Sequence, residues 1–268
     1  MLKNHPRSCV MNMSIHGALQ KTIAVLTIFL ATTWSCHSSE LVVWSAGAVK
    51  PPLEDLAPEF QKATGIQLQV EYAPVGVLMR RLAQGNMPDV LILSAEVVKE
   101  TENRGWAPMG SAVPLGSVGV GIAVKQGQPI PDISTPEALR NALLAAPSVT
   151  YMDPQKGTSG KHFANVLDQL GIADQMRAKT TLGDIGYVLE PVARGEIALG
   201  IQQITEILPV KGAVLVGPLP PPLQKITTYS IMPTVKAADS ASVVKFRRFL
   251  QLPAAQAVFK LKGFIVEY

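Results

Sequence analysis

The chain has 268 residues, with 24 Lys and Arg against 20 Asp and Glu, and its formal charge is +4. This length suffices for one large domain or two moderate ones, and the ordinary composition excludes a disordered or fibrous protein. No acidic residue precedes Glu40, so removing Lys3, Arg7 and Lys21 lowers the formal charge from +4 to +1. The body of the chain is therefore nearly neutral, which gives no reason to expect nucleic acid as a partner.

Residues 1–38 have the three regions of a secretory signal peptide in the usual order. Positive residues precede the apolar run Ile23–Ala31, and small polar residues follow it. The run is short for a membrane span. We predict cleavage between Ser35 and Ser38 and export to the periplasm. An uncleaved anchor and a later start methionine are the alternatives, and Cys36 follows a poor lipoprotein cleavage box.

The body of the chain is almost free of metal-binding and nucleophilic side chains. Cys9 and Cys36 lie in or beside the leader, and His162 is the one histidine after residue 38. A disulfide, a thiol nucleophile and a cysteine metal site are excluded, and the pattern disfavours a histidine zinc site or a serine–histidine triad. We expect no metal and no cofactor.

The first part of the body alternates strands and helices. Apolar runs predict strands at 41–45, 67–72 and 89–94, and helical spacing of apolar residues predicts helices from 50 and from 75. This βαβαβ order predicts right-handed crossovers and a doubly wound sheet. Ligands of such sheets bind beyond the carboxyl ends of the strands.

A second unit repeats the alternation after a strand at 118–124. It contains the predicted helix 135–145, strand 148–152, a helix after Thr158, a helix around 187–194 and strand 198–202. Prolines between 218 and 222 indicate a stiff connection. A strand at 227–233 and helices at 240–251 and 254–261 end the chain. We predict one lobe from 39–120 with 224–268, a second lobe from 121–223, and a ligand between them.

The stretch from Tyr151 to His162 is the centre of this prediction. A strand ends, Gly157 permits a turn, and Thr158 is a suitable N-cap for the helix that follows. Helix starts offer unpaired N–H groups to small anions, and several lysine and hydroxyl side chains surround this one. Helix capping by Thr158 and solvation of both lysines explain the same residues without a ligand.

Short motifs spread over nearly the whole body resemble those of the periplasmic molybdate-binding proteins. Their order and spacing are specific to that family. They are 41–48 with 53–56, Gly85 with 88–90, 94–96, Asp153-Pro154 with Gly160, 199–201, and 253–256 with 262–264. The resemblance implies a type II periplasmic-binding-protein fold of the α/β class, with two lobes. Each lobe is then a doubly wound sheet flanked by helices, and the ligand lies in the interlobe cleft.

The oxyanion-binding side chains of that family are partly missing here. Ala48 replaces a serine after the first strand, Pro74-Val75-Gly76 replaces serines after the second, and Gln203 lies near the position of a late tyrosine. These departures disfavour molybdate. The lysines and helix starts still favour an anion, and their pattern suits carboxylates.

The segments 44–47 and 155–160 resemble the aconitate isomerase branch of the same superfamily more than the molybdate pattern. This implies interconversion of trans- and cis-aconitate by an allylic proton shift, with a small tricarboxylate as the ligand. The shift needs a base, a proton donor and stabilisation of carboxylate charge. The alternative is the substrate-binding component of an ABC transporter for molybdate-like oxyanions or small carboxylates, with a permease as its partner.

His162 is the preferred candidate for the catalytic base, because histidine titrates near working pH. Lys50, Tyr187 and Glu190 are weaker candidates, and each has an ordinary reading as a solvated, packed or capping residue. The expected substrate-binding residues surround the predicted cleft. They are Ser45, Gly47, Ala48, Gly76, Lys156, Thr158, Ser159 and Gln203.

Overall fold

The computed structural model describes residues 40–184 and 188–266. The strands are β1 (Glu40–Ala46), β2 (Gln67–Ala73), β3 (Val90–Ser94), β4 (Val113–Lys125), β5 (Val149–Met152), β6 (Thr180–Gly183), β7 (Leu199–Gln203), β8 (Ala213–Pro218) and β9 (Ile226–Pro233). The α-helices are α1 (Lys50–Thr64), α2 (Val75–Ala83), α3 (Val98–Asn103), α4 (Pro136–Ala145), α5 (Thr158–Gln169), α6 (Ala173–Arg177), α7 (Glu190–Arg194), α8 (Ile204–Ile207), α9 (Ala241–Leu250) and α10 (Pro253–Leu261). Short 3-10 turns lie at Gly47–Val49, Ala95–Val97, Pro221–Leu223 and Val235–Ala237.

The first sheet has the order β2-β1-β3-β9-β4. Strands β1, β2 and β3 are parallel and linked through α1 and α2, whereas β9 runs antiparallel to β3 and β4. All five residues of β3 are buried, as a central strand covered on both faces requires. The predicted βαβαβ unit is therefore confirmed.

The second sheet is built around β5 and β7. Strand β5 lies parallel to both β6 and β7, and β4 lies antiparallel to both β7 and β8. Helix α5 packs its fully buried Phe163 and Val166 on this sheet. Tyr151 of β5 meets the Phe163 ring edge-on, with 5.0 Å between the ring centroids.

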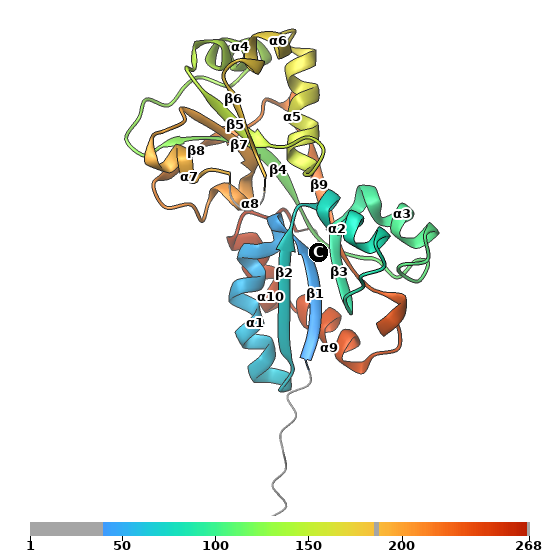
Figure 1. Ribbon diagram of the computed structural model, residues 1–268. Coiled ribbons are helices and arrows are strands. Elements are labelled where there is room, and N and C mark those ends of the chain that lie inside the picture. The colour runs from blue at the N-terminus through green and yellow to red at the C-terminus, as the bar shows by residue number, and fades with distance from the viewer. Residues whose placement is uncertain (1–39, 185–187, 267–268) are drawn as a thin grey trace, which may run out of the picture. The chain divides into compact units, whose positions relative to one another are not determined.

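Strand β4 belongs to both sheets (Figure 1). Its residues from Val113 to Gly119 pair with β9, and those from Val120 to Lys125 pair with β7 and β8. Because β4 passes from one core into the other, its residues from Val118 to Val124 are all buried and apolar.

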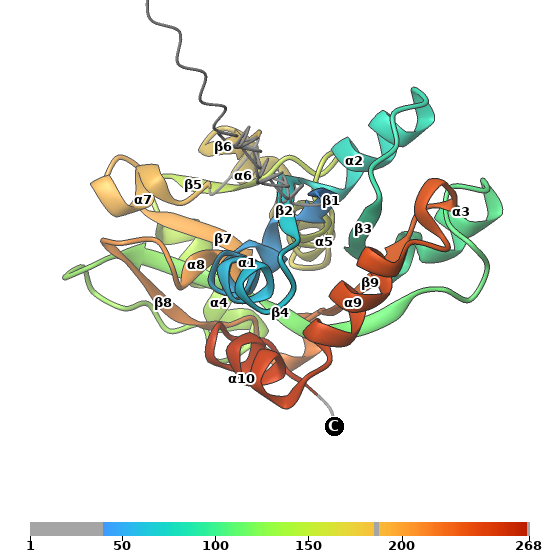
Figure 2. The same cartoon turned by 90° about the horizontal axis from the view of Figure 1, so that it is seen from below.

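The helices at the two ends of the chain pack together on the first sheet. Phe60 of α1 is fully buried against Phe246 and Phe249 of α9, with ring centroids 5.1 and 5.3 Å away. Helix α10 also contacts α1, and Figure 2 shows both late helices near this early one. No helix within the described ranges is long and apolar enough to cross a membrane.

Several elements were not predicted. Strand β8 was missed because its residues precede the prolines that we interpreted as a connection, although only Pro218 belongs to the strand itself. The short elements α3, α6, β6 and α8 have four to six residues each, too few for a clear periodic pattern. Part of the helix predicted around 187–194 lies outside the described residues, and α7 begins at Glu190.

Candidate functional site

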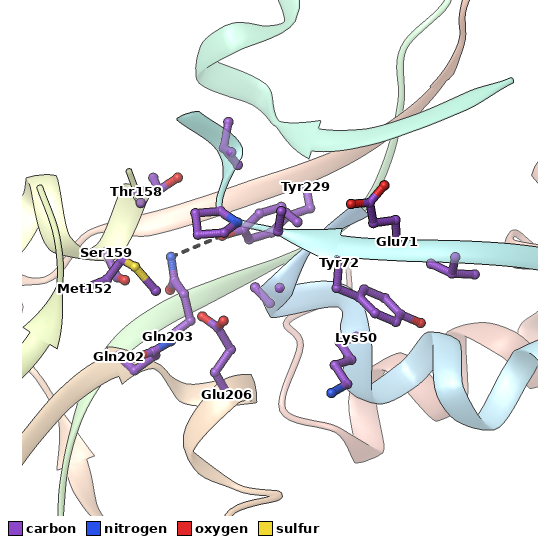
Figure 3. A pocket seen from close by; sticks show the side chains of 18 residues that line it. Lys50, Glu71, Tyr72, Met152, Thr158, Ser159, Gln202, Gln203, Glu206 and Tyr229 are labelled. Carbon is purple, nitrogen blue, oxygen red and sulfur yellow. Dashed lines mark hydrogen bonds between the residues drawn. The ribbon is translucent and has the colours of Figure 1, made fainter. Parts of the chain in front are cut away.

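A cavity of about 340 Å³ lies where β1, β2, β5 and β7 reach their carboxyl ends. This is the position expected for ligands of doubly wound sheets. Figure 3 shows its side chains converging from both sheets. The lining residues are 46–48, Lys50, 70–75, Met152, 157–159, Gln202, Gln203, Glu206 and Tyr229.

Helical turns begin at four places on the cavity wall, and none has a side-chain cap. The residues before these turns are Ala46, Pro74, Gly157 and Gln203, and none of them accepts a hydrogen bond from the turn through its side chain. The first N–H groups of a helix lack intrahelical partners and carry partial positive charge. At the start of α2, Gly76 N donates to Lys156 O, and a bound anion would satisfy the N–H groups that remain unpaired at these starts.

Thr158 does not cap α5 as predicted. Helix α5 starts at Thr158 itself, and Gly157 is the N-cap, with an extended backbone at φ −124° and ψ 150°. The turn closes one residue earlier because Gly157 and Lys156 both donate N–H bonds to Asp153 O. Thr158 and Ser159 thus reach the cavity from the first turn of the helix.

Two glutamines at the end of β7 place amide groups in the buried wall. Gln203 Nε2 donates to the hydroxyl of Tyr229 over 3.3 Å (Figure 3). The remaining amide atoms, Gln203 Oε1 with Nε2 and Oε1 of Gln202, have no hydrogen-bond partner among the described residues. Burial raises the pKa of Tyr229 far above its ordinary value, so its hydroxyl keeps its proton.

Glu206 brings a carboxyl group into the same wall. It lies on α8, one turn after β7, and only 8% of the residue is exposed. Burial raises the pKa of Glu206 to about 7, and the neighbouring Gln202 side chain acts in the opposite direction. The carboxyl packs against Gly47, where a Cβ atom would lie 2.6 Å from Glu206 Oε1.

Lys50 and Tyr72 form the facing part of the wall. Lys50 Nζ lies 3.7 Å from Glu54 Oε1 and 5.8 Å from the centroid of the Tyr72 ring. The pKa of the Tyr72 hydroxyl is raised strongly, first by burial and then by the charge of Glu54. Glu71 also lines the cavity, but it is half exposed and forms an ion pair with Arg81.

The structure brings six of the predicted site residues to the cavity wall and leaves the others away from it. Those on the wall are Gly47, Ala48, Lys50, Thr158, Ser159 and Gln203. Ser45 is fully buried in β1, where its hydroxyl donates to Ala46 O over 3.1 Å. Glu190 lies exposed at the start of α7. Tyr187 lies outside the described residues.

Lys156 and Gly76 meet each other instead of the cavity. Gly76 N donates to Lys156 O over 2.9 Å, which joins the start of α2 to the turn before α5. A Cβ at Gly76 would lie 2.9 Å from that same carbonyl, so glycine permits the close approach. The Lys156 ammonium pairs with Asp184 and lies 3.8 Å from Asp153. These two carboxylates explain its charge without a ligand.

His162 lies on α5 beyond the part of the helix that lines the cavity. Its Nε2–H donates to Leu223 O over 2.8 Å, which ties α5 to the turn at Pro221–Leu223. Burial lowers the pKa of His162, although the hydrogen bond to Leu223 O acts in the opposite direction. In this structure His162 therefore joins α5 to the Pro221–Leu223 turn and does not line the cavity.

Sequence reasoning missed Gln202, Glu206 and Tyr229. One signal was available, since Glu206 is the one charged residue between Leu199 and Val210, directly after a predicted strand. A lone carboxyl in an apolar run at a strand's carboxyl end is a candidate buried acid. Within the described residues, no group of three or more His, Cys, Asp or Glu side chains is placed to hold a metal ion.

Comparisons with known proteins agree with this architecture. The aconitate isomerase of a Pseudomonas species is 33% identical over 218 residues, which cover 78% of this chain and 82% of that protein. The molybdate-binding protein ModA of Escherichia coli K12 is 23% identical over 247 residues, 91% of this chain and 96% of ModA. The solved periplasmic molybdate-binding protein of Azotobacter vinelandii superposes with a TM-score of 0.71 at 20% identity, covering 85% of this chain and all of that one.

The solved structures that this chain resembles are two-lobed periplasmic binding proteins, and the fold predicted from the sequence is confirmed. The family profile described as bacterial extracellular solute-binding protein matches residues 41–265. This chain therefore belongs to the bacterial extracellular solute-binding proteins.

Proposed function

We propose that this protein is an aconitate isomerase, which interconverts trans- and cis-aconitate without a cofactor. The 33% identity to the Pseudomonas aconitate isomerase supports this function, because the match extends over most of both chains. We also propose that residues 1–38 direct export to the periplasm, in keeping with an extracellular family.

One observation carries the proposal that a polar ligand fills this cavity. Three amide atoms of Gln202 and Gln203 are buried on its wall and lack a hydrogen-bond partner in the described part of the chain. A buried polar atom without a partner costs about 1–3 kcal/mol. A ligand that brings carboxylate oxygens and bound water would recover this free energy, because the amides then gain both acceptors and donors.

The size of the cavity favours a tricarboxylate over a single tetrahedral oxyanion. Its volume is about 340 Å³, whereas each oxygen of an oxyanion fills roughly the 30 Å³ of one water molecule. Apolar groups from Val70, Val75 and Met152 also form part of the wall. These suit the carbon chain of an organic acid and offer nothing to an oxyanion.

The charge distribution suits an acid with several separated carboxylates. Uncapped helix starts open onto the cavity from both sheets, and Lys50 adds a positive side chain beside the start of α1. Each helix start stabilises negative charge by about 0.3–1 kcal/mol at an exposed site and by more in a partly buried one. The same groups would stabilise the charge that builds up on the substrate during proton transfer.

The alternative function is that of a transport receptor for a molybdate-like oxyanion or a small carboxylate, with an ABC permease as its partner. The similarity to ModA extends over nearly the whole chain and supports this alternative function. A receptor of that kind would bind its ligand and leave it unchanged.

The test is to incubate the purified protein with trans-aconitate and follow conversion by ultraviolet absorbance and proton NMR. Calorimetric titrations with trans-aconitate, molybdate and saturated propane-1,2,3-tricarboxylate run on the same sample. We expect conversion to the cis isomer, and binding of the saturated acid without reaction. Absence of conversion, together with tight binding of molybdate, would contradict the proposal and support the transport receptor.

A further inference from the structure

Glu206 has no evident place in a site that only binds anions. An ionised carboxyl group repels an anionic ligand, and a buried one does so strongly because the interior screens charge weakly. The other glutamate of the cavity, Glu71, is half exposed and paired with Arg81. Glu206 is buried, and no Lys or Arg of residues 40–184 and 188–266 forms an ion pair with it.

The position of Glu206 is set by the backbone on both sides of the cavity. Its helix α8 follows β7 directly, and its carboxyl reaches across to the turn after β1, which contacts α8. At that turn the absence of a side chain on Gly47 lets Oε1 approach closely, since a Cβ would lie only 2.6 Å away. The carboxyl is therefore held against the start of that turn, on the wall of the cavity.

The environment also gives Glu206 the properties of a base at neutral pH. Burial raises its pKa to about 7, so the group is partly ionised under ordinary conditions and accepts a proton readily. Gln202, which lies beside it on the wall, works against this rise. A general acid or base is most effective when its pKa lies near the working pH.

We propose that Glu206 is the catalytic base of the allylic proton shift, an assignment that rests on the proposed isomerase function. Its carboxylate removes a proton from the substrate methylene group, and the electrons of that C–H bond form a new double bond to the central carbon. The electrons of the old double bond move to its other carbon, with charge delocalised into the adjacent carboxylate. A proton returned by Glu206 then bonds to that carbon. No oxidant, reductant or water is consumed.

Glu206→Gln tests this assignment because the amide keeps the size of the side chain and cannot act as a base. We expect conversion of trans-aconitate to fall by about 100-fold or more, while calorimetry still detects binding. Glu59→Gln is the matched control, since Glu59 lies on the exposed face of α1. It should convert at the wild-type rate.

A second measurement does not depend on how well Glu206→Gln folds. The wild-type kcat/KM should fall below a pH near 7, because the protonated carboxyl cannot accept a proton. Gln202→Met removes the neighbour that lowers the Glu206 pKa, so this acidic limb should move to higher pH. A purely structural glutamate would leave the limb in place.

The possible failures are distinguishable. Wild-type protein that neither converts nor binds trans-aconitate would overturn the proposed function itself. Wild-type protein that converts, with full activity in Glu206→Gln, would overturn only the role of Glu206. Loss of conversion in His162→Gln with full conversion in Glu206→Gln would assign the base to His162 instead.

Discussion

Two polar segments lie at the carboxyl ends of neighbouring strands in the second sheet, and they differ sharply. The turn from Lys156 to His162 follows β5 and is rich in charged and hydroxyl groups. The segment from Gln202 to Glu206 spans the end of β7 and the start of α8, and it contains one charge. In the first segment both Lys156 and His162 are bonded to other parts of the protein. In the second, amide atoms and a carboxyl are buried without full partners.

The difference shows that a dense cluster of charges is a poor guide to a binding wall. Lys156 is neutralised by Asp153 and Asp184, two acids that lie close to it in space. The groups best placed to bind a ligand are instead the buried amide atoms of Gln202 and Gln203 that have no hydrogen-bond partner among the described residues. Glutamine carries no charge, so these residues do not stand out in the sequence. Three experiments can break or sharpen this contrast.

The largest expected effect is on the pH dependence of stability. The folded protein holds the Glu206 proton up to a pKa of about 7, whereas the unfolded chain releases it near the ordinary value of 4.5. Between these values the unfolded state binds fewer protons, so raising the pH favours unfolding. The loss amounts to about 3 kcal/mol by pH 8, at 1.36 kcal/mol per pKa unit.

Urea denaturation of the wild type and of Glu206→Gln between pH 4 and pH 8 measures this loss. The free energy of unfolding of the wild type should fall relative to that of the variant as the pH rises. Glu59→Gln should follow the wild type, because Glu59 is exposed. Parallel curves for wild type and Glu206→Gln would show that the buried carboxyl is not protonated in the folded protein.

Much of the fold was predictable because buried parallel strands and amphipathic helices leave a periodic signal. The β1–α1–β2–α2–β3 unit and the position of the cavity beyond its strands both follow from that signal. Glu206 and Tyr229 were not predicted, since their roles arise from burial and from partners on distant strands. Whether the Gln202 amide has hydrogen-bond partners depends on the tertiary structure around it, and no local sequence pattern contains that information.

The next effect concerns two glutamines in opposite situations. Gln202 has two unpartnered amide atoms, whereas Gln224 accepts from Val120 N and donates to Val120 O, each over 2.9 Å. Below pH 7, where Glu206 is protonated and does not need Gln202 as a donor, Gln202→Met should raise the free energy of unfolding of the ligand-free protein by about 1–2 kcal/mol, because it removes unpaired buried groups. It should also weaken trans-aconitate binding by about 10- to 150-fold, since a hydrogen bond to a charged group contributes about 1.5–3 kcal/mol.

Gln224→Met should do the reverse to stability. It leaves the Val120 N–H without its partner, whereas Val120 O still accepts from Leu219 N, so the free energy of unfolding should fall by about 1–3 kcal/mol. Thermal and urea unfolding of both variants, with calorimetric titration of each, give the comparison. Destabilisation of the ligand-free protein by Gln202→Met would mean that the Gln202 amide already has partners. The strongest structural argument for a polar ligand in this cavity would then be lost.

The smallest effect on ligand affinity should come from replacing Lys156, which lies in the stretch that the sequence most strongly predicted to bind an anion. Its ammonium lies near the surface between two carboxylates, and such ion pairs contribute about 0–1 kcal/mol. Lys156→Met keeps the main-chain carbonyl that accepts from Gly76, so the link between α2 and the turn before α5 survives. We expect trans-aconitate affinity within about threefold of wild type, as for Lys236→Met, a surface pair with Asp89. A much larger loss for Lys156→Met alone would mean that this lysine leaves its two carboxylates when the ligand binds, and Lys156 would then belong to the binding wall.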